Sequence, residues 1–266
     1  MKLKSAKAVY LSPFLRKPIS TTLVSMTLLV CGGGSIVPAN ADTAVAATKF
    51  ASGDTSSAAC TNESNFLAGT VVEYESRDNL SSAVSRNKTE TLGPEPFAGV
   101  NPIASLHTSY LNNSSLFQTT TYAQIKDGRL IRYGDRHGAG ASLVTTTYNP
   151  PPSTPIDLQP GETFTVSYRG KAVGTGVTVE FDVSEKHTYE GRETIKTSLG
   201  TFNTCKFTNE ISTKSASGND PKYLIVQNWF PAQGPYRGQS IRSMTPAANG
   251  APERISEVVK MQYRVR

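Results

Sequence analysis

The sequence predicts an all-β protein, a single curved antiparallel sheet or partly open β-barrel of about ten strands that follows an export signal and a flexible arm. Apolar and polar residues alternate with a period of two in successive segments from residue 69 to the end. Glycine and proline clusters separate these segments, and few stretches have a helical period. We therefore divide the chain into a signal peptide over 1–41, a flexible arm over 42–65 and a single antiparallel β domain over 66–266.

Residues 1–41 have the composition of an export signal. Their basic residues precede a short apolar run over 23–30, and the segment contains no acidic residue. The run is too short for a membrane-spanning helix, which needs about 20 apolar residues. The basic residues are Lys2, Lys4, Lys7, Arg16 and Lys17.

Two processing sites compete in this segment. Residues 39–41 read A-N-A, so cleavage after Ala41 would release a mature chain that begins at Asp42. In the alternative, residues 28–35 resemble a bacterial lipobox followed by a glycine-rich tether, and Cys31 is lipidated. Val30 fits a lipobox poorly, because Ala or Gly usually stands before the lipidated cysteine. We therefore rank release ahead of lipidation.

The charge of the chain comes mainly from its signal. Lys and Arg number 27 and Asp and Glu 21, which gives a formal net charge of +6. Residues 1–41 hold 5 of the basic residues, so the rest of the chain has 22 basic against 21 acidic residues, a net charge of +1. Nucleic-acid binding needs a concentrated basic surface, and this balance argues against it.

The cysteine count predicts one disulfide. Cys31 belongs to the signal or the lipid anchor, which leaves Cys60 and Cys205. An even pair in an oxidising compartment favours a bond between them, which would stabilise the fold by about 4–5 kcal/mol in the chain-entropy treatment. The alternative is two separate thiols.

Each expected element rests on a local pattern. Residues 42–65 are rich in Ala, Ser and Thr without periodicity, and predict the arm. Val72 and Tyr74 alternate with Glu73 and Glu75, which indicates a first strand with one buried face. Residues 92–102 contain three prolines and predict a loop. The remaining strands of the first half are expected over 81–91, 115–125, 129–133 and 141–148.

The second half alternates more regularly. Residues 149–155 are proline-rich, and we interpret them as a loop within one domain because both sides have the same strand character. A Gly200 turn joins two runs as a hairpin. Strands are expected over 163–168, 176–184, 193–198, 201–213, 223–230 and 259–265.

This hairpin carries a family resemblance. Residues 189–195 read Y-E-G-R-E-T-I and residues 199–205 read L-G-T-F-N-T-C. Together with residues 126–134 and 229–234 they resemble DUF3108-like exported bacterial proteins of unknown function. The resemblance covers roughly residues 69–266. It implies a β-rich envelope protein related to curved, half-barrel lipid carriers, and it supplies no catalytic residues.

No residue pattern in the sequence predicts a catalytic, metal-binding or phosphate-binding site. The histidines are His107, His137 and His187, and the sequence contains no zinc-type motif, phosphate loop or nucleophile elbow. We expect no catalytic residue, metal or cofactor. The cluster formed by Asp182, Glu185 and His187 is interpreted as a solvated strand edge, and the glycine-rich run 135–140 as a hairpin connection.

These patterns favour a non-enzymatic envelope protein. The first hypothesis is a carrier for an apolar small molecule or lipid, because many strands have one apolar face and no helix covers it. The alternative is a structural or interaction protein with a filled core that contacts other envelope proteins. A hydrolase or metal enzyme is the least supported class. We expect a periplasmic or outer-membrane-associated location, with membrane contact only through a lipid on Cys31. The candidate ligand-facing residues are Phe164, Phe181, Phe207, Trp229 and Tyr263.

Overall fold

A computed structural model describes residues 55–265 apart from 82, 112–113, 217–220 and 249, so residues 1–54 with Cys31 and Ala41 lie outside it. Thirteen strands in the described part of the chain form one antiparallel sheet. The strands are β1 Val71–Asp78, β2 Val84–Pro94, β3 Ile103–Leu111, β4 Ser114–Lys126, β5 Arg129–His137, β6 Val144–Asn149, β7 Ser153–Pro155, β8 Thr163–Gly174, β9 Val177–Thr197, β10 Gly200–Ser215, β11 Lys222–Pro231, β12 Arg242–Thr245 and β13 Arg254–Arg264.

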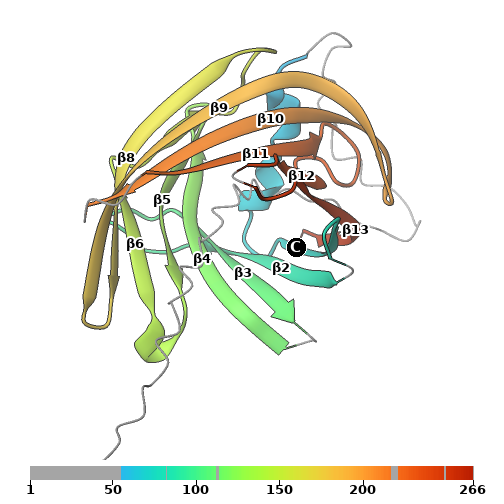
Figure 1. Cartoon of the computed structure of the whole chain (residues 1–266). Helices are drawn as coiled ribbons and strands as arrows, with labels where there is room; N and C mark the ends of the chain where they lie inside the picture. Colours follow the sequence, from blue (N-terminus) through green and yellow to red (C-terminus); the bar gives the residue numbers. More distant parts are fainter. Residues whose placement is uncertain (1–54, 82, 112–113, 217–220, 249, 266) are drawn as a thin grey trace, which may run out of the picture.

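The sheet closes into a barrel. The strand order runs β4-β3-β2-β1-β13-β12-β11-β10-β9-β8-β6-β5, and β5 also pairs with β4. This ring contains twelve of the thirteen strands, and β7 adds to β5 beside β6. Figure 1 shows the long strands β8, β9 and β10 arching over one side of the barrel. The predicted all-β fold is confirmed, with closure in place of a partly open edge.

Strand β9 is longer than the sequence indicates. Its 21 residues replace the two expected strands over 176–184 and 193–198. Polar residues such as Glu185 and His187 obscure the apolar pattern between these two runs, yet the alternation of faces continues through them. At Gly191, whose φ is +116°, a register shift inserts one extra residue opposite Lys206 and Phe207. The bulge lets one strand curve around the barrel.

The proline-rich segment 149–155 is partly strand. β6 ends at Asn149, and β7 resumes the pairing with β5 after three prolines. Proline lacks an N–H group but still accepts a hydrogen bond, and Arg132 N donates to Pro152 O at 3.0 Å. The segment therefore stays beside β5. Strands β3 and β12 are further elements that the sequence did not predict.

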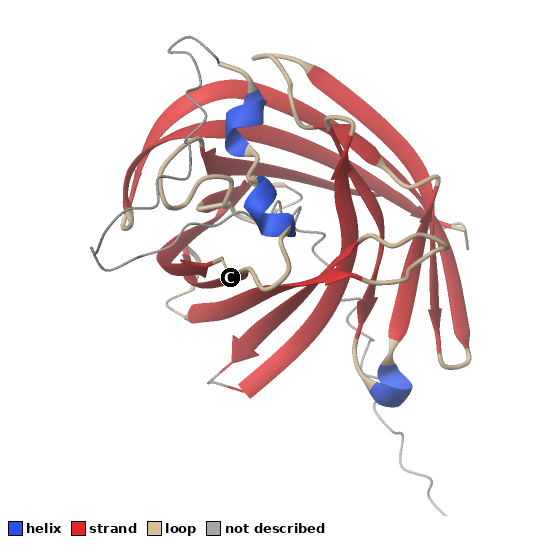
Figure 2. Ribbon diagram, turned by 180° about the vertical axis from the view of Figure 1, so that it is seen from behind, coloured by secondary structure: helices blue, strands red, loops and turns tan. Residues whose placement is uncertain are grey.

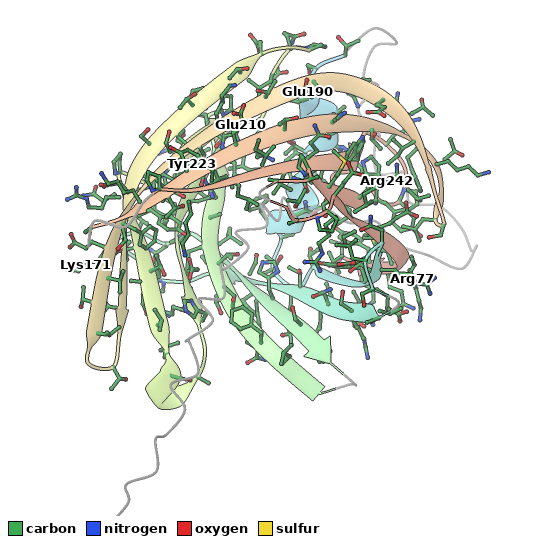
Figure 3. All side chains as sticks on the ribbon, in the orientation of Figure 1. Arg77, Lys171, Glu190, Glu210, Tyr223 and Arg242 are labelled. Carbon is green, nitrogen blue, oxygen red and sulfur yellow. A yellow bond between two sulfur atoms is a disulfide. The ribbon has the colours of Figure 1, made fainter. Side chains whose placement is uncertain are left out.

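Cross-strand ion pairs cover the outer face of the barrel. Glu73 lies 3.0 Å from both Arg86 and Arg264, and Lys186 lies 2.7 Å from Glu210. Figure 3 labels Glu210 on the outer surface of β10. A face that carries such pairs is hydrated. None of the helices among the described residues has the length and apolar composition of a membrane-spanning segment.

Residues 55–66, which we call the plug, lie inside the barrel. They form the 3-10 helices η1 Ser57–Cys60 and η2 Glu63–Phe66, which are seen within the barrel in Figure 2. A third 3-10 helix, η3 Gly140–Ser142, joins β5 to β6. The prediction of a flexible arm up to residue 65 is therefore wrong for residues 55–65.

Specific contacts hold the plug against the wall. Ser57 N donates to Leu158 O at 2.9 Å, and Leu158 N donates back to Ser57 Oγ at 2.8 Å. Arg237 Nε donates to Ala59 O at 2.8 Å, and Thr91 Oγ1 donates to Asn65 O at 2.6 Å. These bonds satisfy backbone groups that no sheet partner reaches.

The predicted disulfide is confirmed. Cys60 in the plug is bonded to Cys205 in β10, with a Cα–Cα distance of 6.1 Å and a sequence separation of 145. Around it Leu158, Tyr189 and Phe230 form an apolar cluster. The disulfide thus joins the plug to the inner wall of β10.

Candidate functional site

An apolar cavity lies between the plug and the barrel wall. Its volume is about 70 Å³. The plug contributes Phe66, the loop before β8 contributes Leu158, and β10 and β11 contribute Phe207 and Phe230. The complete lining is Ser57, Cys60, Thr61, Phe66, Ile125, Leu130, Thr154, Pro155, Ile156, Leu158, His187, Phe207, Asn209 and Phe230. The cavity is mostly apolar, with a small set of polar side chains.

A buried polar cluster begins where His187 and Asn209 line the cavity. They face each other across β9 and β10, and His187 Nδ1 lies 2.6 Å from Asn209 Oδ1. The other ring nitrogen, Nε2, lies 3.1 Å from Glu185 Oε2. Both ring nitrogens therefore lie within hydrogen-bonding distance of a side-chain oxygen.

Glu185 is the centre of the cluster and is completely buried. Tyr168 donates its hydroxyl to Glu185 Oε1 at 2.5 Å, and the Arg132 guanidinium is paired with Oε2. Arg132 also lies over the Tyr168 ring, 5.9 Å from its centroid. Strands β5, β8, β9 and β10 thus each contribute to one network, which we call the polar cluster: Arg132, Tyr168, Glu185, His187 and Asn209.

The cluster holds Glu185 ionised although its side chain is fully buried. Burial raises the pKa of the Glu185 carboxyl, but the hydrogen bond from His187, the charge of Arg132 and the bond from Tyr168 outweigh it and lower the pKa to about 2. Burial lowers the pKa of Arg132, while the neighbouring carboxylate raises it, and the net shift is upward. Burial and then Glu185 raise the pKa of Tyr168, which keeps its proton. The cluster is a fixed ion pair with little tendency to exchange protons.

A second polar chain lies beside it on β5 and β6. Tyr148 donates its hydroxyl to Asp135 Oδ2 at 2.8 Å, and His137 Nδ1 lies 3.2 Å from Asp135 Oδ1. Burial and the charge of Asp135 raise the pKa of Tyr148. Asp135 and His137 therefore belong to a strand with a buried carboxylate, and the prediction that residues 135–140 form a hairpin connection is wrong for residues 135–137.

The solvated-edge prediction for Asp182, Glu185 and His187 holds for Asp182 alone. Asp182 pairs with Arg169 on the outer face at 3.0 Å, where more than half of each side chain is exposed. Glu185 and His187 are 0% and 3% exposed. They lie on the same face of β9 as Val183 and Tyr189, which are also buried. Extending the period of two along β9 therefore predicts that both side chains are buried.

The five predicted ligand-facing aromatic residues do not gather in one place. Phe207 lines the cavity, and the other four are not part of its lining. Phe164 lies under the Arg129 guanidinium, and Phe181 packs beside Tyr148, Tyr168, Val183 and Ile211.

The last two of these aromatics share one apolar cluster. Trp229 and Tyr263 belong to the cluster of Val72, Ile195, Ile241, Val258 and Met261. Trp229 follows Asn228, which is opposite Phe207, so it leaves β11 on the other face of the sheet. Its Nε1 donates to Glu193 Oε2 at 3.1 Å. Asn209 was not among the predicted site residues, although it shares the inner face of β10 with Phe207 and Ile211.

Within the described residues, no group of three or more His, Cys, Asp or Glu side chains is arranged to hold a metal ion. The polar cluster presents hydrogen-bonding groups to the cavity and keeps its charges paired behind them. This arrangement can orient a bound molecule by hydrogen bonding.

Comparison with known protein sequences identifies no family. No protein-family model matches the chain, and no curated protein sequence matches it significantly. No family model therefore supports the resemblance to DUF3108-like proteins.

Solved structures share part of the chain path. A Bacteroides fragilis protein described as exported and as having a YmcC-like fold is 12% identical, with a TM-score of 0.47; the match covers 73% of this chain and 96% of that one. A Parabacteroides distasonis protein described as a lipoprotein is 10% identical, with a TM-score of 0.46, and the coverage is 74% and 96%. The hypothetical lipoprotein YmcC from Escherichia coli is 12% identical, with a TM-score of 0.31 and coverage of 73% and 85%. With TM-scores below 0.5 and identities of 10–12%, these similarities identify neither a family nor a function.

Proposed function

We propose that this protein is an exported, non-enzymatic binding module that holds a small apolar group inside its barrel. The observation that carries the proposal is the mostly apolar cavity with a few polar side chains, among them His187 and Asn209, at its wall. Small-molecule sites are concave and mainly apolar, with a few polar groups that fix orientation, and barrels commonly enclose them.

The cavity volume limits the ligand. About 70 Å³ is roughly half of the 150 Å³ cavity that accommodates benzene. A complete acyl chain would need the plug to move, and the Cys60–Cys205 disulfide opposes that movement. A short apolar group, or the end of a larger molecule, fits without rearrangement.

The proposed location is the cell envelope. The charge pattern of residues 1–41 supports export, and the Cys60–Cys205 bond fits an oxidising compartment. Lipidation at Cys31 would supply the membrane contact. The near-neutral charge after residue 41 supports partners other than nucleic acid, with envelope proteins as candidates.

Native mass spectrometry tests the binding function. The protein is purified from the bacterial envelope without denaturant, and its native and denatured masses are compared. We expect a discrete excess mass that denaturation removes. Leu130→Phe, which fills the cavity, should abolish this excess, whereas Leu116→Phe at an exposed leucine should retain it.

The alternative function is structural, and the small cavity volume favours it. A barrel whose interior is filled by its own plug needs no ligand. Equal native and denatured masses for the wild type would support this alternative and count against the binding proposal, and capture of a defined envelope protein through the charged outer face would support it further.

A further inference from the structure

The cavity contains a hydrogen-bond donor that lacks a partner. Asn209 is 4% exposed, and its side-chain Oδ1 is engaged by His187 Nδ1. No hydrogen bond joins its Nδ2 to any other residue that the structure describes. Buried amide groups are almost always hydrogen-bonded, so an open N–H group on a cavity wall indicates a missing acceptor.

Two other polar residues of the lining, His187 and Ser57, are already engaged. Both ring nitrogens of His187 face oxygens of Glu185 and Asn209. Ser57 Oγ donates to Ile156 O at 2.9 Å and accepts from Leu158 N. The hydroxyls of Thr61 and Thr154 can donate or accept, so they are compatible with an acceptor on the ligand.

The lining also restricts ligand charge. No Asp, Glu, Lys or Arg is among the described residues that line the cavity. Arg132 and Glu185 are paired with each other outside the lining, and Glu185 contacts the lining residue His187. A carboxylate or ammonium group in the cavity would lose its hydration without meeting an opposite charge, which is strongly unfavourable.

We propose that the ligand has an uncharged carbonyl oxygen, as in a ketone, ester or amide, on a small apolar body. The oxygen accepts from Asn209 Nδ2, and the body packs against Phe207 and Phe230. This inference rests on the binding function proposed above and specifies the chemical class of its ligand.

Four compounds with the same five-atom skeleton test this class: 2-butanone, 2-methylbutane, propanoate and sec-butylamine. Their binding to the wild-type protein is measured in sealed tubes by saturation-transfer NMR titration. We expect 2-butanone to bind about five-fold more tightly than 2-methylbutane, the effect of one neutral hydrogen bond. Propanoate and sec-butylamine should bind more weakly than 2-methylbutane.

Two variants locate the effect. Asn209→Leu removes the donor and should bring 2-butanone and 2-methylbutane to equal affinity. Glu210→Leu introduces the same side chain one residue away on the outer face and should leave the five-fold difference unchanged. The comparison of four compounds on the wild type stands even where Asn209→Leu fails to fold.

The outcomes separate the two proposals. Binding of 2-methylbutane as tight as that of 2-butanone, or tightest binding by either charged compound, overturns the carbonyl inference and leaves the binding function in place. Absence of binding by all four compounds, together with absence of xenon binding by NMR, overturns the binding function and the inference with it.

Discussion

Two neighbouring pairs on strands β9 and β10 have the same register and opposite surroundings. His187 faces Asn209 on the inside of the barrel, and Lys186 faces Glu210 on the outside. The inner residues are 3% and 4% exposed, whereas the outer side chains are 47% and 45% exposed. The contact distances are similar, 2.6 Å for His187 with Asn209 and 2.7 Å for Lys186 with Glu210. Electrostatic interactions are nevertheless much stronger in the buried environment than in the exposed one.

This comparison indicates where charge matters in the barrel. The side chains of the outer pairs can bind water instead of each other, so losing such a pair changes the free energy of unfolding little. Inside, every charged or polar group depends on its neighbours, because removing one leaves another buried without compensation. Stability and binding should therefore respond to the inner face of these strands and hardly to the outer face.

The largest effect is expected at Glu185. Glu185→Leu leaves Arg132 and His187 buried without their carboxylate and should lower the free energy of unfolding by about 3–5 kcal/mol. Arg132→Leu combined with Glu185→Leu removes both charges of the pair and should cost less than Glu185→Leu alone. Denaturant titration measures both variants. A loss below about 1 kcal/mol for the single variant would contradict the importance of the inner network.

The disulfide should have the next largest effect. Replacing Cys60 and Cys205 together by serine frees the plug from β10 and should cost about 4 kcal/mol, since the bond closes a loop with a sequence separation of 145. Thermal unfolding measures the loss. Hydrogen exchange should increase most in residues 55–66, and uniform exchange across the barrel would show that the bond does not hold the plug specifically.

Acid should weaken the fold through Glu185. Its carboxyl titrates at about 2 when folded and near 4.5 when unfolded, so the unfolded state takes up this proton first as the pH falls. The contribution is complete above about pH 4.5 and is lost progressively toward pH 2, and it amounts to about 3 kcal/mol. Unfolding midpoints of the wild type and Glu185→Gln should converge over this range. Parallel curves would mean that Glu185 has an ordinary pKa in the folded protein.

The smallest effect is expected on the outer face. Lys186→Met and Glu210→Gln should each change the free energy of unfolding by about 0.5 kcal/mol or less, and added salt should reduce the change further. Denaturant titration at low and high salt measures it. A cost comparable to that of Glu185→Leu would remove the contrast between the two faces.

The fold was largely predictable because alternation survives in most strands. Val177, Val179, Phe181 and Val183 share one face of β9, which is exposed at Val177 and Val179 and buried at Val183, and the same period reaches the buried Glu185 and His187. The prediction failed there because carboxylates and imidazoles are usually exposed. Asn209 has the same parity as Phe207 and could have been placed by the same reasoning.

Other parts of the site were beyond sequence reasoning. Arg132 and Asp135 are three residues apart, so a regular strand would place them on opposite faces. A bulge inserts Tyr133 between paired positions of β4 and β5, and both residues therefore take part in the buried polar networks. No local signal marks such a shift. The plug has no periodicity, and its position depends on contacts with residues about 100 or more positions away, such as Ser57 with Leu158 and Cys60 with Cys205.

The pairing of β1 with β13 determines when the barrel can close. Val72 is opposite Tyr263, so the first strand of the ring lies beside the last. During synthesis β1 has no partner on that side until residues 254–264 have been made, and the hairpins between them must wait with open edges. Closure therefore has to wait until β13 has been synthesised. A truncated product that lacks β13 would expose two strand edges and would be prone to aggregate.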